Sequence, residues 1–244
     1  MSTTLRPPHP ADAPPLDWSQ TPLEAEYAGY YVKIIDNLFS DAECAELIAL
    51  ALSDQQWQEA EVNYGTKAGE STVMKDYRNG ERIIRFDAAA GQKIYEKLLP
   101  YIQEIVKVRP GGEWQGIFGV PGRLKDNWDC VGINECLRFL RYEKGGFFRP
   151  HCDGQLDLPD GRCARVTVQI YLGEGEIEGG ATRIHGRRDR YYDVEAKKGR
   201  VLIFQARNLA HSGDDVVKGV KYALRTELMF RRSKPGVFSN LLKK

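Results

Sequence analysis

The segment CLRFLRYEKGGFFRPHCDG, residues 136–154, carries the most informative structural signals of this chain. Its first part, Cys136–Tyr142, is short and largely apolar and predicts a β-strand. The turn EKGG separates it from a second extended segment that ends at His151 and Asp153. Because side chains at i and i+2 project from the same face of a strand, this imidazole and this carboxylate point to one side. The stretch therefore predicts a strand, a glycine turn and two potential metal ligands.

More short apolar segments follow, separated by the glycine-containing turns GEGEIEGG and KKGR. Many short strands with frequent turns favour a sandwich or barrel over a doubly wound parallel sheet. The predicted strands are 166–172, 191–195, 200–205 and 222–230.

The first half of the chain is predicted to be helical. Ser40 and Glu43 form a capping box that opens one helix. A second helix is expected after Asp87, with a kink or a restart at Pro100. The fold class we predict is α+β, mainly β, with a double-stranded β-helix (jelly-roll, cupin-like) core and supporting N-terminal helices.

Composition bounds the domain organisation. The 244 residues are 42% hydrophobic and 28% charged, which is typical of a globular chain with a sizeable core. Residues 1–25 are predicted to be a disordered or irregular, proline-rich tail. Residues 26–244 are predicted to form a single domain with its jelly-roll core at about 131–232. The loops at 63–79 and 111–127 are expected to shape the site.

Charge and cysteine content exclude several classes of partner. A formal charge of +1 favours neither nucleic acid nor an anionic membrane, and no apolar run is long enough to span a bilayer. The five cysteines are odd in number and form no CxxC pair, which favours free thiols in a reducing compartment. We therefore predict a cytoplasmic protein, with the nucleus as the alternative. The sequence makes no prediction of the oligomeric state.

A third candidate ligand, His211, follows in NLAHSGDD. Two histidines and one carboxylate leave coordination positions open, an arrangement used for non-haem Fe(II) and oxygen chemistry. The alternative for Asp153 is a simple turn with Gly154, and a lone histidine is more often a surface residue than a ligand. A zinc hydrolase lacks support because there is no HExxH, and GEGEIEG has the wrong spacing for a nucleotide loop. A non-catalytic, cupin-like metal-binding module stays open.

The last predicted strand, GVKYALRTELMF, supplies two cations. Lys221, Ala223 and Arg225 share one face, because alternate residues of a strand point the same way. Either cation could hold the far carboxylate of a metal-bound 2-oxo acid, lysine as a point charge and arginine through two parallel hydrogen bonds. The alternative for both is a solvated face.

Together these motifs resemble the Fe(II)/2-oxoglutarate-dependent dioxygenases, with the prolyl 4-hydroxylase-like enzymes as the most similar subgroup. The resemblance covers about residues 134–232. It includes RYEKGGFFRPHCDG, DGRCARVTVQIYLG, the Gly-Gly-x-Thr element at 179–182 and GRVLIFQARNLAHSG.

The resemblance implies roles for individual residues. His151, Asp153 and His211 would bind Fe(II) as the catalytic centre. Lys221 would bind the 5-carboxylate of 2-oxoglutarate, with Arg225 as the second candidate. The resemblance also implies O2 as a cosubstrate and ascorbate as a candidate reductant.

The resemblance also implies further residues around this centre. Tyr142 and Tyr171 match tyrosines that contact the cosubstrate; the alternative for each is a packed core aromatic. Arg138 shares the strand face of Tyr142 and is a candidate contact to substrate or cosubstrate; the alternative is an exposed edge residue. Arg78, Arg82 and Arg85 could serve a substrate or form ion pairs, and surface pairing is the simpler expectation.

The reaction that the resemblance implies couples oxidative decarboxylation of 2-oxoglutarate to succinate with hydroxylation, or a related C–H oxidation, of an organic substrate. A small-molecule substrate is slightly favoured. The alternative is a prolyl or other residue in a protein or peptide.

Overall fold

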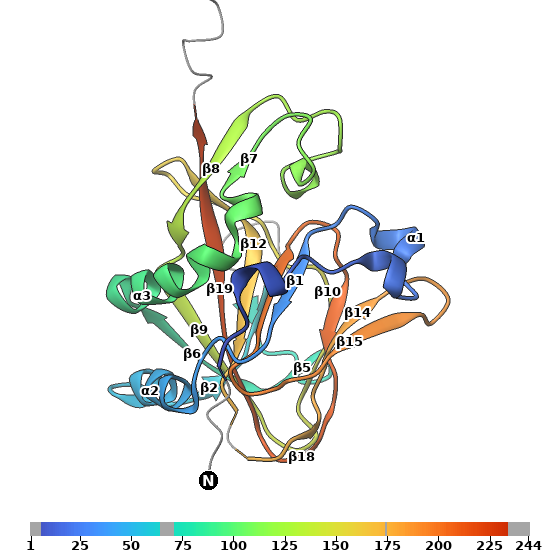
Figure 1. Ribbon diagram of the computed structural model, residues 1–244. Helices are drawn as coiled ribbons and strands as arrows, with labels where there is room; N and C mark the ends of the chain where they lie inside the picture. Colours follow the sequence, from blue (N-terminus) through green and yellow to red (C-terminus); the bar gives the residue numbers. More distant parts are fainter. Residues whose placement is uncertain (1–5, 64–70, 174, 234–244) are drawn as a thin grey trace, which may run out of the picture.

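Two antiparallel sheets face each other and form the core of the structure, a computed structural model that describes residues 6–63, 71–173 and 175–233 (Figure 1). The larger sheet has the order β1 (Val32–Ile35), β16 (Val201–Gln205), β12 (Arg162–Tyr171), β19 (Lys221–Ser233), β9 (Cys136–Tyr142), β6 (Glu81–Phe86) and β2 (Gln58–Glu59). Three strands extend it, namely β7 (Lys107–Val108), β8 (Asn127–Ile133) and β11 (Leu156–Asp157). The second sheet has the order β15 (Tyr191–Val194), β14 (Thr182–His185), β17 (His211–Gly213), β10 (Phe147–His151) and β5 (Arg78–Asn79). This is the predicted mainly β, jelly-roll class.

Two small ladders and several helices complete the described chain. The ladders are β13 (Glu178–Gly179) with β18 (Val216–Lys218), and β3 (Val62–Asn63) with β4 (Ser71–Thr72). The α-helices are α1 (Glu24–Tyr27), α2 (Asp41–Leu52) and α3 (Ala88–Leu98). Single 3-10 turns lie at Pro10–Asp12, Trp18–Gln20, Leu99–Tyr101, Gln103–Ile105 and Gln115–Ile117. None of the described helices is long and apolar enough to cross a bilayer.

Local sequence signals set the helix boundaries as predicted. Ser40 accepts a hydrogen bond from the backbone N–H of Glu43, whose carboxylate accepts from the Ser40 N–H, so the capping box opens α2. Asp87 caps α3 through the N–H of Ala90. Pro100 lies in the 3-10 turn that ends this helical segment, because its ring cannot continue an α-helix.

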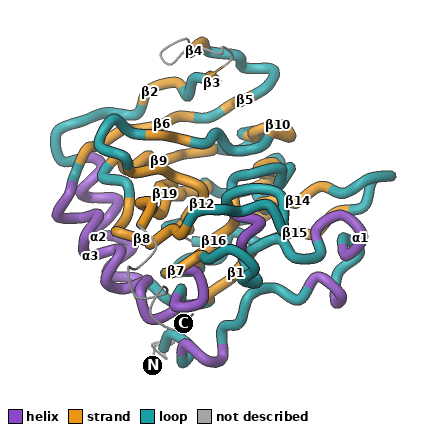
Figure 2. Tube along the Cα trace, turned by 90° about the horizontal axis from the view of Figure 1, so that it is seen from above, coloured by secondary structure: helices purple, strands orange, loops and turns teal. Residues whose placement is uncertain are grey.

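Each central strand of the larger sheet has two different faces. On β12, Val166, Val168 and Ile170 belong to the apolar core that α2 and α3 also line. The alternate residues Thr167 and Gln169 are also buried, but they face the other sheet. Figure 2 shows the same division, with α2 and α3 on one side of the larger sheet and β10, β14 and β15 on the other. The period of two thus separates a structural face from a site-bearing face.

The N-terminal segment packs against the sheets. Trp18 and Leu23 are buried beside Val32 and Phe204 in the core between the sheets. Residues 6–25 contain two 3-10 turns and three buried side chains, Ala13, Trp18 and Leu23, while residues 1–5 lie outside the described residues. The loop predicted at 111–127 is irregular apart from one 3-10 turn, and its last residue begins β8. The loop at 63–79 is described only in part.

Candidate functional site

Strand register brings the two predicted histidines side by side. His151 ends β10 and His211 begins β17, and the two residues are direct partners in the antiparallel ladder. Their ring centroids are 4.3 Å apart. A bulge between Phe148 and His151 shifts the pairing, and the ring of Phe148 stacks on His151 with centroids 3.7 Å apart. The ladder and this aromatic contact therefore fix where the imidazoles point.

Asp153 completes the cluster immediately after β10 ends. Its Oδ1 lies 3.9 Å from Nε2 of His151 and 3.9 Å from Nε2 of His211. All three ligand atoms lie within 4.8 Å of one another. Because bonds from a divalent metal to nitrogen or oxygen are about 2.0–2.2 Å, atoms 3.9 Å apart can share one ion. The residues thus fit a metal centre, and the predicted convergence is present.

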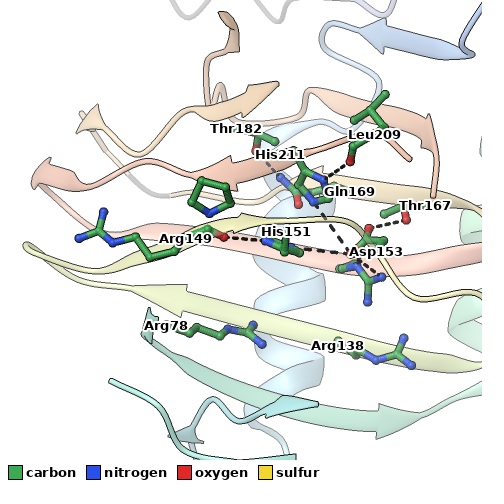
Figure 3. A network of polar contacts seen from close by, with 12 residues as sticks. Arg78, Arg138, Arg149, His151, Asp153, Thr167, Gln169, Thr182, Leu209 and His211 are labelled. Carbon is green, nitrogen blue, oxygen red and sulfur yellow. Dashed lines mark hydrogen bonds and ion pairs between the residues drawn. The ribbon is translucent and has the colours of Figure 1, made fainter. Parts of the chain in front are cut away.

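Both imidazoles are held in the form that a metal requires. Nδ1–H of His151 donates to the carbonyl of Arg149 (2.8 Å), and Nδ1–H of His211 donates to that of Leu209 (3.1 Å), which leaves each Nε2 as a free acceptor (Figure 3). Burial is the main cause that lowers the pKa of His151 to about 3, and the neighbouring His211 is the second cause. Burial also lowers the pKa of His211. Neutral imidazoles at physiological pH can bind a metal without first losing a proton.

The carboxylate of Asp153 is fixed by two side chains from the larger sheet. The hydroxyl of Thr167 donates to Oδ2 at 2.6 Å. Arg225 contacts Oδ1 through Nη2 at 2.9 Å and Oδ2 through Nε at 3.3 Å. Burial alone would raise the pKa of Asp153, but Arg225 and the two histidines lower it overall. With Oδ2 occupied, Oδ1 is the atom directed to the histidines, which favours single-atom coordination and leaves metal positions open.

Lys221 and Arg225 line the same cavity, as their shared strand face predicts, but their partners differ. Arg225 is paired with Asp153 and Glu227, so its charge is already compensated. Lys221 is buried and forms no ion pair with a carboxylate of the described residues, although Asp214 lies near enough to support its charge. Burial lowers the pKa of Lys221 to about 8. Lys221 is therefore the cation better placed to bind an incoming carboxylate.

The two predicted tyrosines lie on either side of Lys221. Its Nζ is 5.8 Å from the ring centroid of Tyr142 and 5.7 Å from that of Tyr171. The hydroxyl of Tyr142 accepts hydrogen bonds from Nε and Nη2 of Arg78 and faces the cavity. The hydroxyl of Tyr171 donates to Thr182 at 2.7 Å. Tyr142 and Thr182 line the cavity, whereas Tyr171 is fully buried and is not among its lining residues.

Arginines line the wall of the cavity opposite the metal ligands (Figure 3). Arg138 lies on β9, which pairs with β6 on one side and β19 on the other. The predicted alternative of an exposed edge position is therefore wrong. Arg82 forms the expected ion pair, with Glu61. Arg78 instead reaches the site, with its guanidinium 4.5 Å from the ring centroid of Phe148. The cavity has a volume of about 870 Å³, within the range of small-molecule sites.

Two polar residues within an otherwise apolar predicted strand could have indicated further site residues. Thr167 and Gln169 are polar residues at alternate positions of the otherwise apolar VTVQIY. Their spacing of two predicts one shared face, the face that carries the site. The role of Glu227 depends on Arg138 reaching it from the neighbouring strand β9, whereas Arg225 lies two residues before it on β19 itself.

Gly179, within the Gly-Gly-x-Thr element, permits a close backbone contact. Its φ is +75°, and a Cβ there would lie 2.3 Å from the carbonyl oxygen of Asp215. Only glycine fits such a position. The contact joins β13 to β18 just before Thr182 enters β14.

Comparison with known proteins agrees with this geometry. Residues 137–226 match the model of the 2OG-Fe(II) oxygenase superfamily, and this segment contains all three candidate ligands. A comparison with curated proteins gave no match.

Similar solved structures include three prolyl hydroxylases. A prolyl-4-hydroxylase from Pseudomonas putida has 16% identity and a TM-score of 0.56 over 85% of this chain and 99% of that one. A prolyl hydroxylase from Trichoplax adhaerens, in complex with a hypoxia inducible factor peptide fragment, has 14% identity and a TM-score of 0.54 over 84% and 85%. The viral collagen prolyl hydroxylase of Paramecium Bursaria Chlorella virus-1, as a 2OG complex, has 20% identity and a TM-score of 0.51 over 84% and 98%. At these identities the likeness establishes a shared fold.

Proposed function

Because the site-bearing segment of this chain belongs to the 2OG-Fe(II) oxygenase superfamily, we propose that the protein hydroxylates a small organic molecule at a centre formed by His151, Asp153 and His211. The observation that carries the proposal is the convergence of these three side chains, with free Nε2 atoms and a fixed carboxylate, beside the buried Lys221. Iron, 2-oxoglutarate and O2 would supply the oxidising chemistry, with succinate and carbon dioxide as coproducts.

The protein's own residues would hold and orient the reactants. The two imidazoles and Oδ1 of Asp153 would bind one face of the metal and leave the remaining positions to the cosubstrate and oxygen. Lys221 would pair with the 5-carboxylate of 2-oxoglutarate in a dry environment, where a charge pair is stronger than in water. Tyr142 would donate its hydroxyl hydrogen to the same carboxylate, because its oxygen already accepts from Arg78.

Arg225 would serve the metal ligand and not the cosubstrate. Its guanidinium contacts both oxygens of Asp153, so it is not available to a second carboxylate in the same geometry. Lys221 and Arg225 would thus have different tasks, although the sequence left both as candidates for one. Ascorbate stays a candidate reductant for keeping the iron ferrous.

Two kinds of substrate are compatible with this centre. The cavity volume of about 870 Å³ supports a small molecule beside 2-oxoglutarate. A residue of a peptide is the second candidate, supported by the shared fold with a prolyl hydroxylase that binds a peptide fragment. Succinate formation measured with small-molecule and peptide panels separates the two.

The test of the proposed centre is Asp153→Ala. We expect it to abolish iron-dependent conversion of 2-oxoglutarate to succinate and to leave the circular dichroism spectrum unchanged. The matched control is Asp157→Ala, which removes an exposed aspartate four residues away that pairs with Arg165. Full succinate production by Asp153→Ala would remove Asp153 from the centre. Succinate production lost equally in Asp157→Ala would show a general structural effect.

A further inference from the structure

Arg138 and Arg225 form an arrangement that stability alone does not explain. The two residues are direct partners on the neighbouring strands β9 and β19. Like charges placed directly opposite each other in an antiparallel pair are destabilising. The single carboxylate between them is Glu227, which contacts Arg138 at 3.0 Å and Arg225 at 3.2 Å. Local costs of this kind are expected mainly at functional sites.

The hydrogen bonds of Arg138 leave one edge of its guanidinium available. Nη1 donates to both carboxylate oxygens of Glu227, at 3.0 and 3.1 Å, and weakly to the carbonyl of Cys136. Within the described part of the chain, Nε and Nη2 have no hydrogen-bond acceptor. This Nε–Nη2 edge has the geometry that binds a carboxylate through two parallel hydrogen bonds. Glu227 holds the other end in place, since it is buried and also accepts from Asn134 at 2.7 Å.

Arg138 lines the cavity that contains the metal ligands. Arg138 is flanked within the sheet by β6 and β19, and its side chain retains 27% exposure. It lines the same cavity as His151 and Asp153, and Figure 3 shows it lying beneath Asp153. A ligand bound to Arg138 would therefore lie beside the proposed metal.

Charge balance favours an anion at this position. The described side chains at the cavity comprise five cations against four anions: Arg78, Arg82, Arg138, Lys221 and Arg225 against Glu61, Asp153, Asp214 and Glu227. The histidines are neutral. A divalent metal and the 2-oxoglutarate dianion cancel each other, so the loaded cavity keeps one positive charge. One negative group on the substrate would compensate it.

We infer that Arg138 is a specificity-determining residue that binds a carboxylate of the substrate, so that the substrate is a carboxylic acid oxidised near its anionic group. This inference rests on the proposed function. The carboxylate could belong to a free acid, such as an amino acid or an aliphatic acid, or to the acidic side chain or C-terminus of a peptide. Glu227 positions Arg138 and does not touch the substrate.

The experiment measures binding without turnover. Protein loaded with Mn(II) and 2-oxoglutarate is titrated, in the absence of O2, with the common L-amino acids and with straight-chain acids of two to eight carbons. Each acid is compared with its primary amide by ligand-detected NMR. Peptides that end in a free carboxylate are compared with the same peptides ending in an amide, which distinguishes the two sources of the carboxylate.

The expected result is that acids bind and their amides bind about 10- to 100-fold more weakly, the worth of a charge-assisted contact. Arg138→Gln should weaken acids by the same factor and leave the amides unchanged, and Arg138→Lys should restore part of the affinity. The control is Arg141→Gln, on the same strand but paired with Glu81 outside this cavity. It should bind acids as the wild type does.

Three results would overturn the inference: acids and amides of equal affinity, acid affinity unchanged in Arg138→Gln, or no acid bound at all. The proposed function fails differently, through the absence of metal-dependent 2-oxoglutarate binding and succinate formation in the wild-type protein. The two failures are thus read from separate measurements.

Discussion

The hydrogen bond from Thr167 to Asp153 offers a sharp test of how the metal ligand is held. Thr167 is fully buried, and its hydroxyl donates to Oδ2 at 2.6 Å. Thr167→Val keeps the branched shape and removes only the donor. A hydrogen bond to a charged group contributes about 1.5–3 kcal/mol, or roughly 10- to 150-fold in an equilibrium constant. Loss of an outer contact to a metal ligand typically weakens metal binding about 10- to 100-fold.

We therefore expect Thr167→Val to weaken Mn(II) or Co(II) binding by about 10- to 100-fold, measured by isothermal titration calorimetry on metal-free protein. The matched control is Thr226→Val. Thr226 is equally buried on the neighbouring strand, but its hydroxyl donates to the backbone carbonyl of Asn134 at 2.8 Å and not to a metal ligand. This control should lower thermal stability without changing metal affinity.

Metal affinity that stays at the wild-type value in Thr167→Val would refute the reasoning, because the carboxylate would then not depend on this donor for its orientation. An equal loss of metal affinity in both variants would also count against it. Such a result would trace the effect to the packing of the sheet.

Three further predictions concern the cosubstrate. Lys221→Met should raise the 2-oxoglutarate concentration needed for half-maximal succinate formation by about 10- to 100-fold. Arg225→Met should mainly weaken metal binding. The reverse pattern would exchange the roles of the two residues. Because burial lowers the pKa of Lys221 to about 8, its ammonium is charged below that pH and becomes neutral above it. 2-Oxoglutarate affinity, measured by calorimetry, should thus hold below pH 8 and fall as the pH rises through 8, and Lys221→Arg should remove this dependence. Tyr142→Phe should weaken 2-oxoglutarate binding by about 0.5–1.5 kcal/mol, and an unchanged dissociation constant would indicate a packing role alone.

Much of the architecture could be predicted because it depends on local patterns. The capping box at Ser40 and the cap at Asp87 are local side-chain contacts, and the structure confirms both. The strand predicted at Cys136–Tyr142 is β9 with the same ends. The second sheet was harder to predict, since β5, β14 and β17 have only two to four residues and no long apolar run. Their pairing depends on partners distant in the sequence.

Residue types and their spacing are enough to identify the atoms that could bind a metal, namely two imidazoles and a carboxylate, and the strand face that Lys221 and Arg225 share. The pairing of the charges, in contrast, depends on the folded sheets. Arg225 reaches Asp153 across 72 residues of sequence, and Lys221 stays without a carboxylate partner among the described residues. The physical reason is that residue type and spacing fix chemistry and strand faces, whereas ion pairs depend on distances that exist only after the sheets have packed.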